Sequence, residues 1–163
     1  MRFRRVGGIT GKKSADEGTT RLKFWVKRPI SSQMSFDSEI RQAICAHAAW
    51  KDTLNAAVST QRSLISVETV AKDDHCRLGR WLHGLDEPTK ASHRWKCVAH
   101  AHAQFHEEAA QVLALALDGK TSAARAAMSY SSRFAGVSAK LTRELQAWQM
   151  EEAGAPRQRA VLV

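Results

Sequence analysis

The stretch WKCVAHAHAQFHEEAAQVLALAL, residues 95–117, carries apolar side chains at steps of three and four residues. That spacing places them on one face of an α-helix. The face comprises Trp95, Val98, His102, Phe105, Ala109, Val112 and Ala116, with Leu113 and Leu117 beside it. We therefore predict a helix over about 88–117, ended by the Asp-Gly-Lys run at 118–120.

Two further segments show the same periodicity, which predicts helices over about 36–61 and about 121–151. Their apolar faces comprise Phe36, Ile40, Ile44, His47, Trp50, Leu54 and Val58 in the first, and Ala124, Met128, Phe134, Val137, Leu141, Leu145 and Trp148 in the second. Residues 65–84 are mixed, with a helix that ends near Asp73–Asp74 and a short turn over Cys76–Leu82. The pattern predicts an all-α fold, an antiparallel four-helix bundle with a short extra helical turn that carries the cysteine.

Charge and composition divide the chain into three parts. Residues 1–33 hold nine Lys and Arg against two acids and lack helical periodicity, so we interpret them as a disordered basic extension, with Met34 as the native start. We place the bundle domain at 34–151 and a disordered tail at 152–163. Most of the net charge of +9 belongs to the extension, and no aromatic platform accompanies it. Nucleic-acid binding is therefore not expected.

The cysteines and apolar runs bear on location. Three cysteines, an odd number, do not suit a disulfide scaffold and favour a reducing compartment. No apolar segment follows the basic start as in a signal peptide, and the apolar run at 109–117 is too short to span a bilayer. We expect a cytoplasmic protein without a membrane span.

Three histidines occupy positions where the helical pattern calls for apolar side chains. They are His47, His102 and His106, the last two spaced i, i+4. A single such histidine is usually a core residue with one hydrogen bond, and Cys76 in DDHCRLGRWLHG (73–84) could be a buried apolar thiol. A zinc ion would satisfy all four side chains together, since one thiolate and three imidazoles form a good tetrahedral set. HAQFH lacks the glutamate of zinc proteases, which disfavours that chemistry.

The order of these residues resembles the chemoreceptor zinc-binding (CZB) domain family. That family's pattern is an early histidine, a cysteine in C-x-L-G-x-W and a later H-x-x-x-H pair, here His47, residues 76–81 and the pair His102 and His106. The resemblance covers about residues 36–117. It implies that zinc is bound by His47, Cys76, His102 and His106.

The resemblance also implies a function. Four protein ligands leave no open position on zinc, so we do not expect an enzyme. We expect a sensor of zinc or oxidants, with Cys76 as the switch, acting through a homodimer or a chemoreceptor or cyclase partner in chemotaxis or cyclic-di-GMP signalling. The alternative is a zinc-stapled interaction module that senses nothing. No transmembrane pair or cyclase motif accompanies the domain, and the apolar strip of Leu141, Leu145 and Trp148 is a candidate interface.

The other side chains near the cysteine motif are not expected to be the main zinc ligands. Gly79 would permit a tight turn or a close helix approach, while Trp50 and Trp81 would shield the metal from water. Arg77 and Arg80 either stabilise the Cys76 thiolate or form a solvated basic face. We expect no metal ligation by His75, His83, His93 or His100, and we interpret Cys45 and Cys97 as small buried side chains, with Cys97 in reserve as a ligand.

Overall fold

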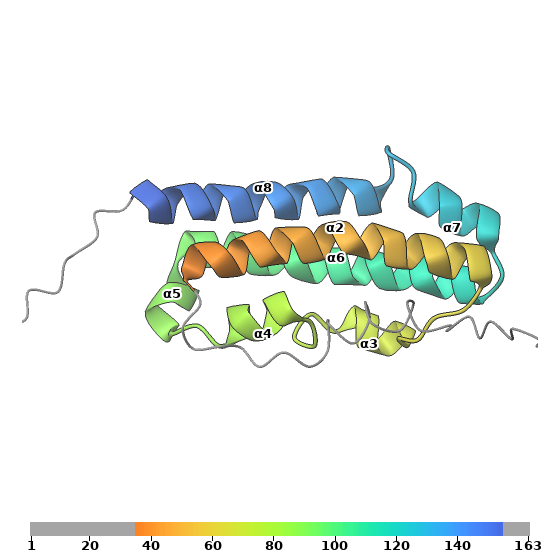
Figure 1. Cartoon of the computed structure of the whole chain (residues 1–163), viewed down its shortest axis with the longest axis horizontal. Helices are drawn as coiled ribbons and strands as arrows, with labels where there is room; N and C mark the ends of the chain where they lie inside the picture. The colour runs from red at the N-terminus through yellow and green to blue at the C-terminus, as the bar shows by residue number, and fades with distance from the viewer. Residues whose placement is uncertain (1–34, 155–163) are drawn as a thin grey trace, which may run out of the picture.

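A computed structural model describes residues 35–154, which are mostly helical (Figure 1). The helices of this part of the chain are α2 Phe36–Thr60, α3 Val67–Ala71, α4 Arg77–His83, α5 Glu87–Ala91, α6 His93–Leu117, α7 Thr121–Ala127 and α8 Arg133–Gly154. No strand occurs among these residues. The all-α prediction is confirmed.

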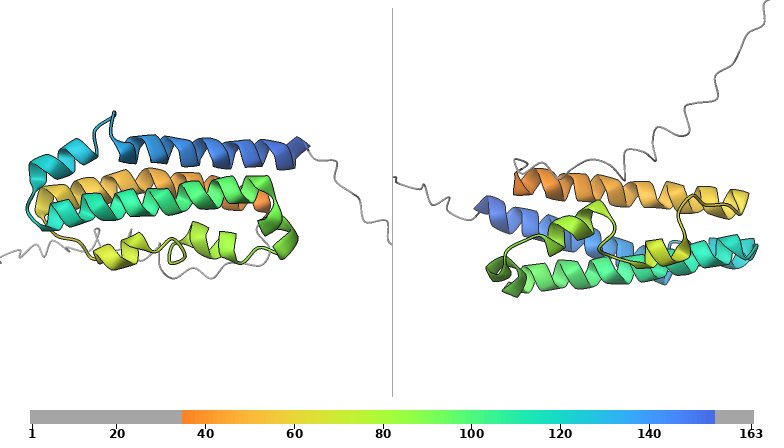
Figure 2. Two further views of the ribbon diagram at one scale, coloured as in Figure 1. Left: turned by 180° about the vertical axis from the view of Figure 1, so that it is seen from behind. Right: turned by 90° about the horizontal axis from the view of Figure 1, so that it is seen from below.

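The three long helices α2, α6 and α8 lie along one another, and each contacts the other two. The short helices α3 and α4 cover the side of α2 and α6 that lies away from α8 (Figures 1 and 2). The chain runs along α2, returns through α3 and α4, runs again along α6 and returns along α8. This course is compatible with the predicted antiparallel four-helix bundle. The short helices α3 and α4, together called the α3–α4 limb, take the place of its second long helix.

The predicted helix over 88–117 is in fact two helices, because Ser92 interrupts it. The backbone at Ser92 is extended (φ −63°, ψ 149°), and its hydroxyl accepts a hydrogen bond from the Trp95 amide that begins α6. Serine competes with helical hydrogen bonding in this way and so favours helix starts over helix interiors.

The predicted helix over 121–151 is also divided. α7 ends at Ala127, and α8 begins at Arg133 after the sequence MSYSS. The Ser132 hydroxyl accepts from the Ala135 amide and thus caps the start of α8. α8 continues to Gly154, three residues beyond the predicted end at 151.

The apolar strip on α8 does not face outward. Leu141 and Leu145 are fully buried and Trp148 is 2 % exposed, packed against the rings of Phe36 and Trp81. The prediction that this strip is an interaction surface was therefore wrong, because the chain's own α6 and α2 pack against α8 and only Trp81 of α4 adds to the cover. The predicted extension 1–33, the start at Met34 and most of the tail lie outside the described residues. No helix in the described part combines the length and hydrophobicity that a membrane crossing requires.

Candidate metal centre

Cys76 lies at the start of α4, where its sulfur caps the helix. The backbone at Cys76 is extended, and its Sγ accepts a hydrogen bond from the Gly79 amide at 3.2 Å. Helix starts favour a residue whose side chain can accept from the free amide groups of the first turn. The predicted short helical turn is thus confirmed, and it fixes the direction in which the sulfur points.

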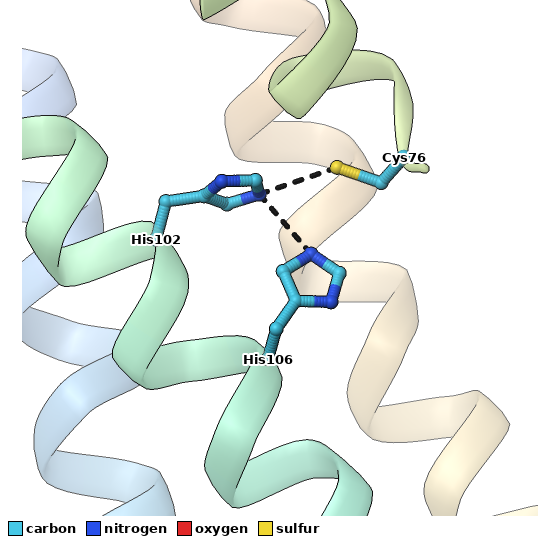
Figure 3. Close-up of side chains that lie close together, drawn as sticks. All are labelled: Cys76, His102 and His106. Atoms are coloured by element: carbon cyan, nitrogen blue, oxygen red, sulfur yellow. Dashed lines mark hydrogen bonds between the residues drawn. The ribbon is translucent and has the colours of Figure 1, made fainter. Parts of the chain in front are cut away.

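His102 and His106 project from adjacent turns of α6 toward that sulfur (Figure 3). His102 Nε2 lies 3.2 Å from Cys76 Sγ and 3.1 Å from His106 Nε2. All three side chains are buried, and their candidate ligand atoms lie within 4.8 Å of one another. Two residues one turn apart on α6 and one from α4 therefore converge on a single point.

A backbone carbonyl sets the orientation of His106. Its Nδ1 lies 2.6 Å from the carbonyl oxygen of Val70, the last buried residue of α3. A carbonyl can only accept, so Nδ1 carries the proton and Nε2 presents its lone pair to the cluster. Metal-binding histidines commonly use their other ring nitrogen in this way.

Burial keeps the three histidines uncharged. It is the main cause that lowers the pKa of His47 to about 3, the pKa of His102 well below its ordinary value and the pKa of His106 to a lesser extent. Burial raises the pKa of the Cys76 thiol to about 11, although the Gly79 and Leu78 amides and the charge of Arg80 oppose the rise. The histidines therefore offer lone pairs at neutral pH, while the thiol must lose a proton to bind metal.

His47 lies beside the cluster of Cys76, His102 and His106 but is not one of the residues whose ligand atoms lie within 4.8 Å of one another. Its side chain is 6 % exposed, and its ring centroid lies 6.0 Å from that of His102. A hydrogen bond to the Ala43 backbone uses one ring nitrogen, whereas the buried Nε2 has no hydrogen-bond partner among the described residues. An unsatisfied buried nitrogen is costly, which is the condition that a metal ion would relieve.

The donor set fits zinc. Ligand atoms in a tetrahedral zinc site lie about 3.3–3.7 Å apart, given metal bonds of about 2.0–2.3 Å. The distances of 3.2 and 3.1 Å at His102 are close to that range. One sulfur and two or three imidazole nitrogens without a carboxylate form a typical zinc set.

Position 79 requires glycine because the backbone of Asp73 and Asp74 passes directly over it. A Cβ built at this position would lie 1.7 Å from the carbonyl oxygen of Asp73 and 2.9 Å from the Asp74 Cα. No side chain can approach backbone atoms so closely. The expected close approach at Gly79 is thus confirmed, and it holds the turn before Cys76 against α4.

Glu39 is a component of the site that sequence reasoning missed. It is 5 % exposed on α2, and its carboxylate accepts from Arg77 Nη2 at 3.0 Å and from Nε at 3.3 Å. Arg77 is the first residue of α4, so this ion pair ties the start of that helix to α2. The interpretation of Arg77 as part of a solvated face was wrong for this reason.

We expect Glu39→Gln to weaken zinc binding about tenfold, the lower end of the effects seen for groups that support metal ligands. A neutral amide would leave the Arg77 charge without its buried partner and loosen the start of α4. A chelator competition titration measures the change. Glu144→Gln is the matched control, since that carboxylate pairs with Arg94 on another part of the bundle. Equal weakening in both variants would contradict the role of Glu39.

The other histidines and cysteines lie outside the cluster. His75, His83, His93 and His100 are exposed, as expected. Cys97 lies 3.4 Å from His93 Nε2, away from the metal centre. Cys45 is exposed, so its interpretation as a buried side chain was wrong.

The tryptophans border the centre from two sides. The Trp50 ring stands edge-on to His106, with centroids 6.1 Å apart. Trp81 lines a cavity of about 10 Å³ together with His47 and Cys76, which leaves room for little more than a water molecule. The predicted shielding from water therefore holds on the Trp81 side, whereas Trp50 also lines a wider cleft beside Cys76 and His106.

Comparison with known families agrees with this geometry. Residues 47–113 match the family model of the chemoreceptor zinc-binding domain. This segment of the chain is similar to a CZB domain. The matched range contains His47, Cys76, His102 and His106, and it begins at the first of them. Zinc is accordingly the cofactor that the Cys76, His102 and His106 cluster serves. No curated protein and no solved structure matches the chain.

Zinc binding to the cluster is expected to release one proton, because Cys76 Sγ is protonated at neutral pH whereas each neutral imidazole binds through its unprotonated nitrogen. The apparent zinc affinity should therefore rise about tenfold per pH unit between about pH 7 and about pH 9. Competition titrations across that interval measure the slope. A slope near zero would show that Cys76 is already a thiolate without metal. That outcome would contradict the raised pKa of its buried thiol.

Proposed function

We propose that the protein is a regulatory zinc domain that senses zinc or oxidants through Cys76. The observation that supports this proposal is the double contact of one sulfur atom. Cys76 Sγ faces the two α6 histidines and also accepts the Gly79 amide that begins α4. Any change in the bonding of this sulfur therefore acts on the helix that it caps.

The metal links several elements at once. Cys76 belongs to the start of α4, His106 is bonded to the Val70 carbonyl of α3, and His102 and His106 lie on α6. Zinc would hold the short α3 and α4 limb against the long helices. Loss of zinc would favour a second arrangement of that limb, and such a population shift is what a sensor requires.

We include His47 as the fourth ligand. Its buried Nε2 lacks a partner among the described residues, and its neighbour His102 is already a member of the cluster. Together these four residues form a site of three histidines and one cysteine. Such a site leaves zinc no position for a substrate or an activated water, so we propose a non-enzymatic role.

Oxidation gives the sensor a chemical basis. With hydrogen peroxide, an S–O bond would form at Cys76 Sγ as the O–O bond breaks and hydroxide leaves. The resulting sulfenic acid is a poor zinc ligand, and a thiol reductant returns it to the thiol. The output would pass through a homodimer or through a chemoreceptor or cyclase partner, in chemotaxis or cyclic-di-GMP signalling.

The alternative is a structural role, in which zinc only staples the bundle together. The burial of the whole cluster favours this reading, since buried zinc sites often supply folding energy. In that case the metal should leave only when the entire fold unfolds.

Peroxide titration of the zinc-loaded chain distinguishes the sensor from the structural role. The sensor predicts zinc release detected by a chromogenic indicator, unchanged long-helix circular dichroism, and recovery of binding after dithiothreitol. Zinc release that occurs only together with the loss of helical signal would contradict the sensor and support the staple. Cys97→Ala should behave as the unmodified chain, because that thiol lies outside the centre.

A further inference from the structure

A cleft of about 450 Å³ borders the metal centre, between α2, α6 and the segment that contains α3 and α4. Small-molecule sites in proteins typically enclose about 300–1,000 Å³. Cys76 and His106 lie along one side of this cleft, so it opens beside two of the metal ligands. The cleft is far larger than zinc itself would need.

One part of the cleft is apolar. Leu64, Ile65, Val70 and Trp50 line it, and Leu64 is 82 % exposed at its rim. The cleft is thus lined by an exposed leucine and a half-buried isoleucine from the segment before α3, and by a buried valine of α3 itself. Such a lining is suited to contact with a hydrocarbon or aromatic body.

The lining of the cleft also carries positive charge. Lys72 and Arg80 line it, and Lys72 has no ion-pair or hydrogen-bond partner within residues 35–154. Arg80 donates from Nη1 to the His75 carbonyl at 2.6 Å, which holds the guanidinium in place. Asp74, the one acid among the described residues that line the cleft, has its carboxylate 3.7 Å from His75 Nε2. The cleft is thus lined both by two cationic side chains and by apolar side chains.

We propose that this cleft binds a small organic anion with an apolar body, such as a medium-chain or aromatic carboxylate. The carboxylate pairs with Lys72 and Arg80, and the apolar body lies against Leu64, Ile65 and Val70. Charge complementarity selects the anion, and the volume limits the body to a small molecule. This site lies beside the zinc ligands and is additional to the proposed sensing of zinc or oxidants.

Binding is tested on the zinc-loaded full chain, labelled with ¹⁵N, by titration with sodium octanoate and separately with octan-1-ol. We expect octanoate to shift the amide signals of residues 64–76 and to bind about tenfold more tightly than the alcohol, the effect of one charge-assisted contact. Equal affinities for the two probes, or octanoate shifts confined to other residues, would overturn the proposal.

Lys72→Glu should weaken octanoate binding about tenfold and leave octanol binding unchanged. Lys96→Glu is the matched control, because Lys96 is an exposed lysine of α6 that does not line the cleft. Zinc content is measured for both variants, so that failure of the metal site is distinguished from failure of the anion site. Equal effects of the two variants on octanoate affinity would overturn the proposal.

Discussion

Gly79→Ala is expected to destabilise the protein by roughly 3 kcal/mol, near the upper end of overpacking effects. The new Cβ would lie 1.7 Å from the Asp73 carbonyl oxygen, so either α4 or the turn before it must move. The displaced segment contains Cys76, and its sulfur would lose both the Gly79 amide and its position opposite His102. Zinc affinity should therefore fall together with stability.

Denaturant unfolding of the zinc-loaded and metal-free variants measures both effects. Gly136→Ala on α8 is the matched control, since a Cβ there meets no atom within 4 Å. Alanine at that helical position should stabilise by about 0.5–1 kcal/mol. If Gly79→Ala changed neither stability nor zinc affinity, the close approach of the chain to α4 would be refuted.

Removal of zinc is expected to raise amide exchange over residues 66–84 while α6 and α8 keep their protection. The short helices have few internal hydrogen bonds, and they depend on the metal ligands and on the core contacts of Val70, Leu78 and Leu82. The long helices retain a large apolar core of their own, which includes Phe105, Phe134 and Leu141.

Hydrogen exchange measured by mass spectrometry, with and without a zinc chelator, tests this difference. Saturating zinc at about a thousand times its dissociation constant would stabilise the folded state by about 4 kcal/mol. Because α3 and α4 depend most on the metal, the largest increase in exchange should appear in peptides that cover these two helices. Uniform loss of protection along the chain would contradict a local role for the metal and would favour the staple.

The sequence predicts the helices well because their apolar spacing is regular over many turns. It does not predict the interruptions, since Ser92 and the run MSYSS occur within otherwise helical patterns. Periodicity identifies an apolar face but not what covers that face. For this reason the strip of Leu141, Leu145 and Trp148 was mistaken for an interface, although α8 packs against α6 and α2 and the strip is buried.

The metal centre is predictable in part. The i, i+4 spacing places His102 and His106 together, and Gly79 indicates a close approach at the cysteine. The partners of those ligands are not predictable, because Val70 is 36 residues from His106 and Glu39 is 38 residues from Arg77. Only the packing of α3 on α6 and of α4 on α2 brings such distant residues into contact. The ligation by His47 remains a prediction.

Metal analysis of the purified chain beside Cys76→Ala and Cys97→Ala tests the central claim most directly. We predict about one zinc per chain in the unmodified protein and in Cys97→Ala, whose thiol contacts His93 outside the centre. Cys76→Ala should lose most of its zinc after exposure to a moderate chelator, because two buried imidazoles of α6 lose their thiolate partner. Equal zinc in all three proteins would contradict the assignment of Cys76 as a metal ligand.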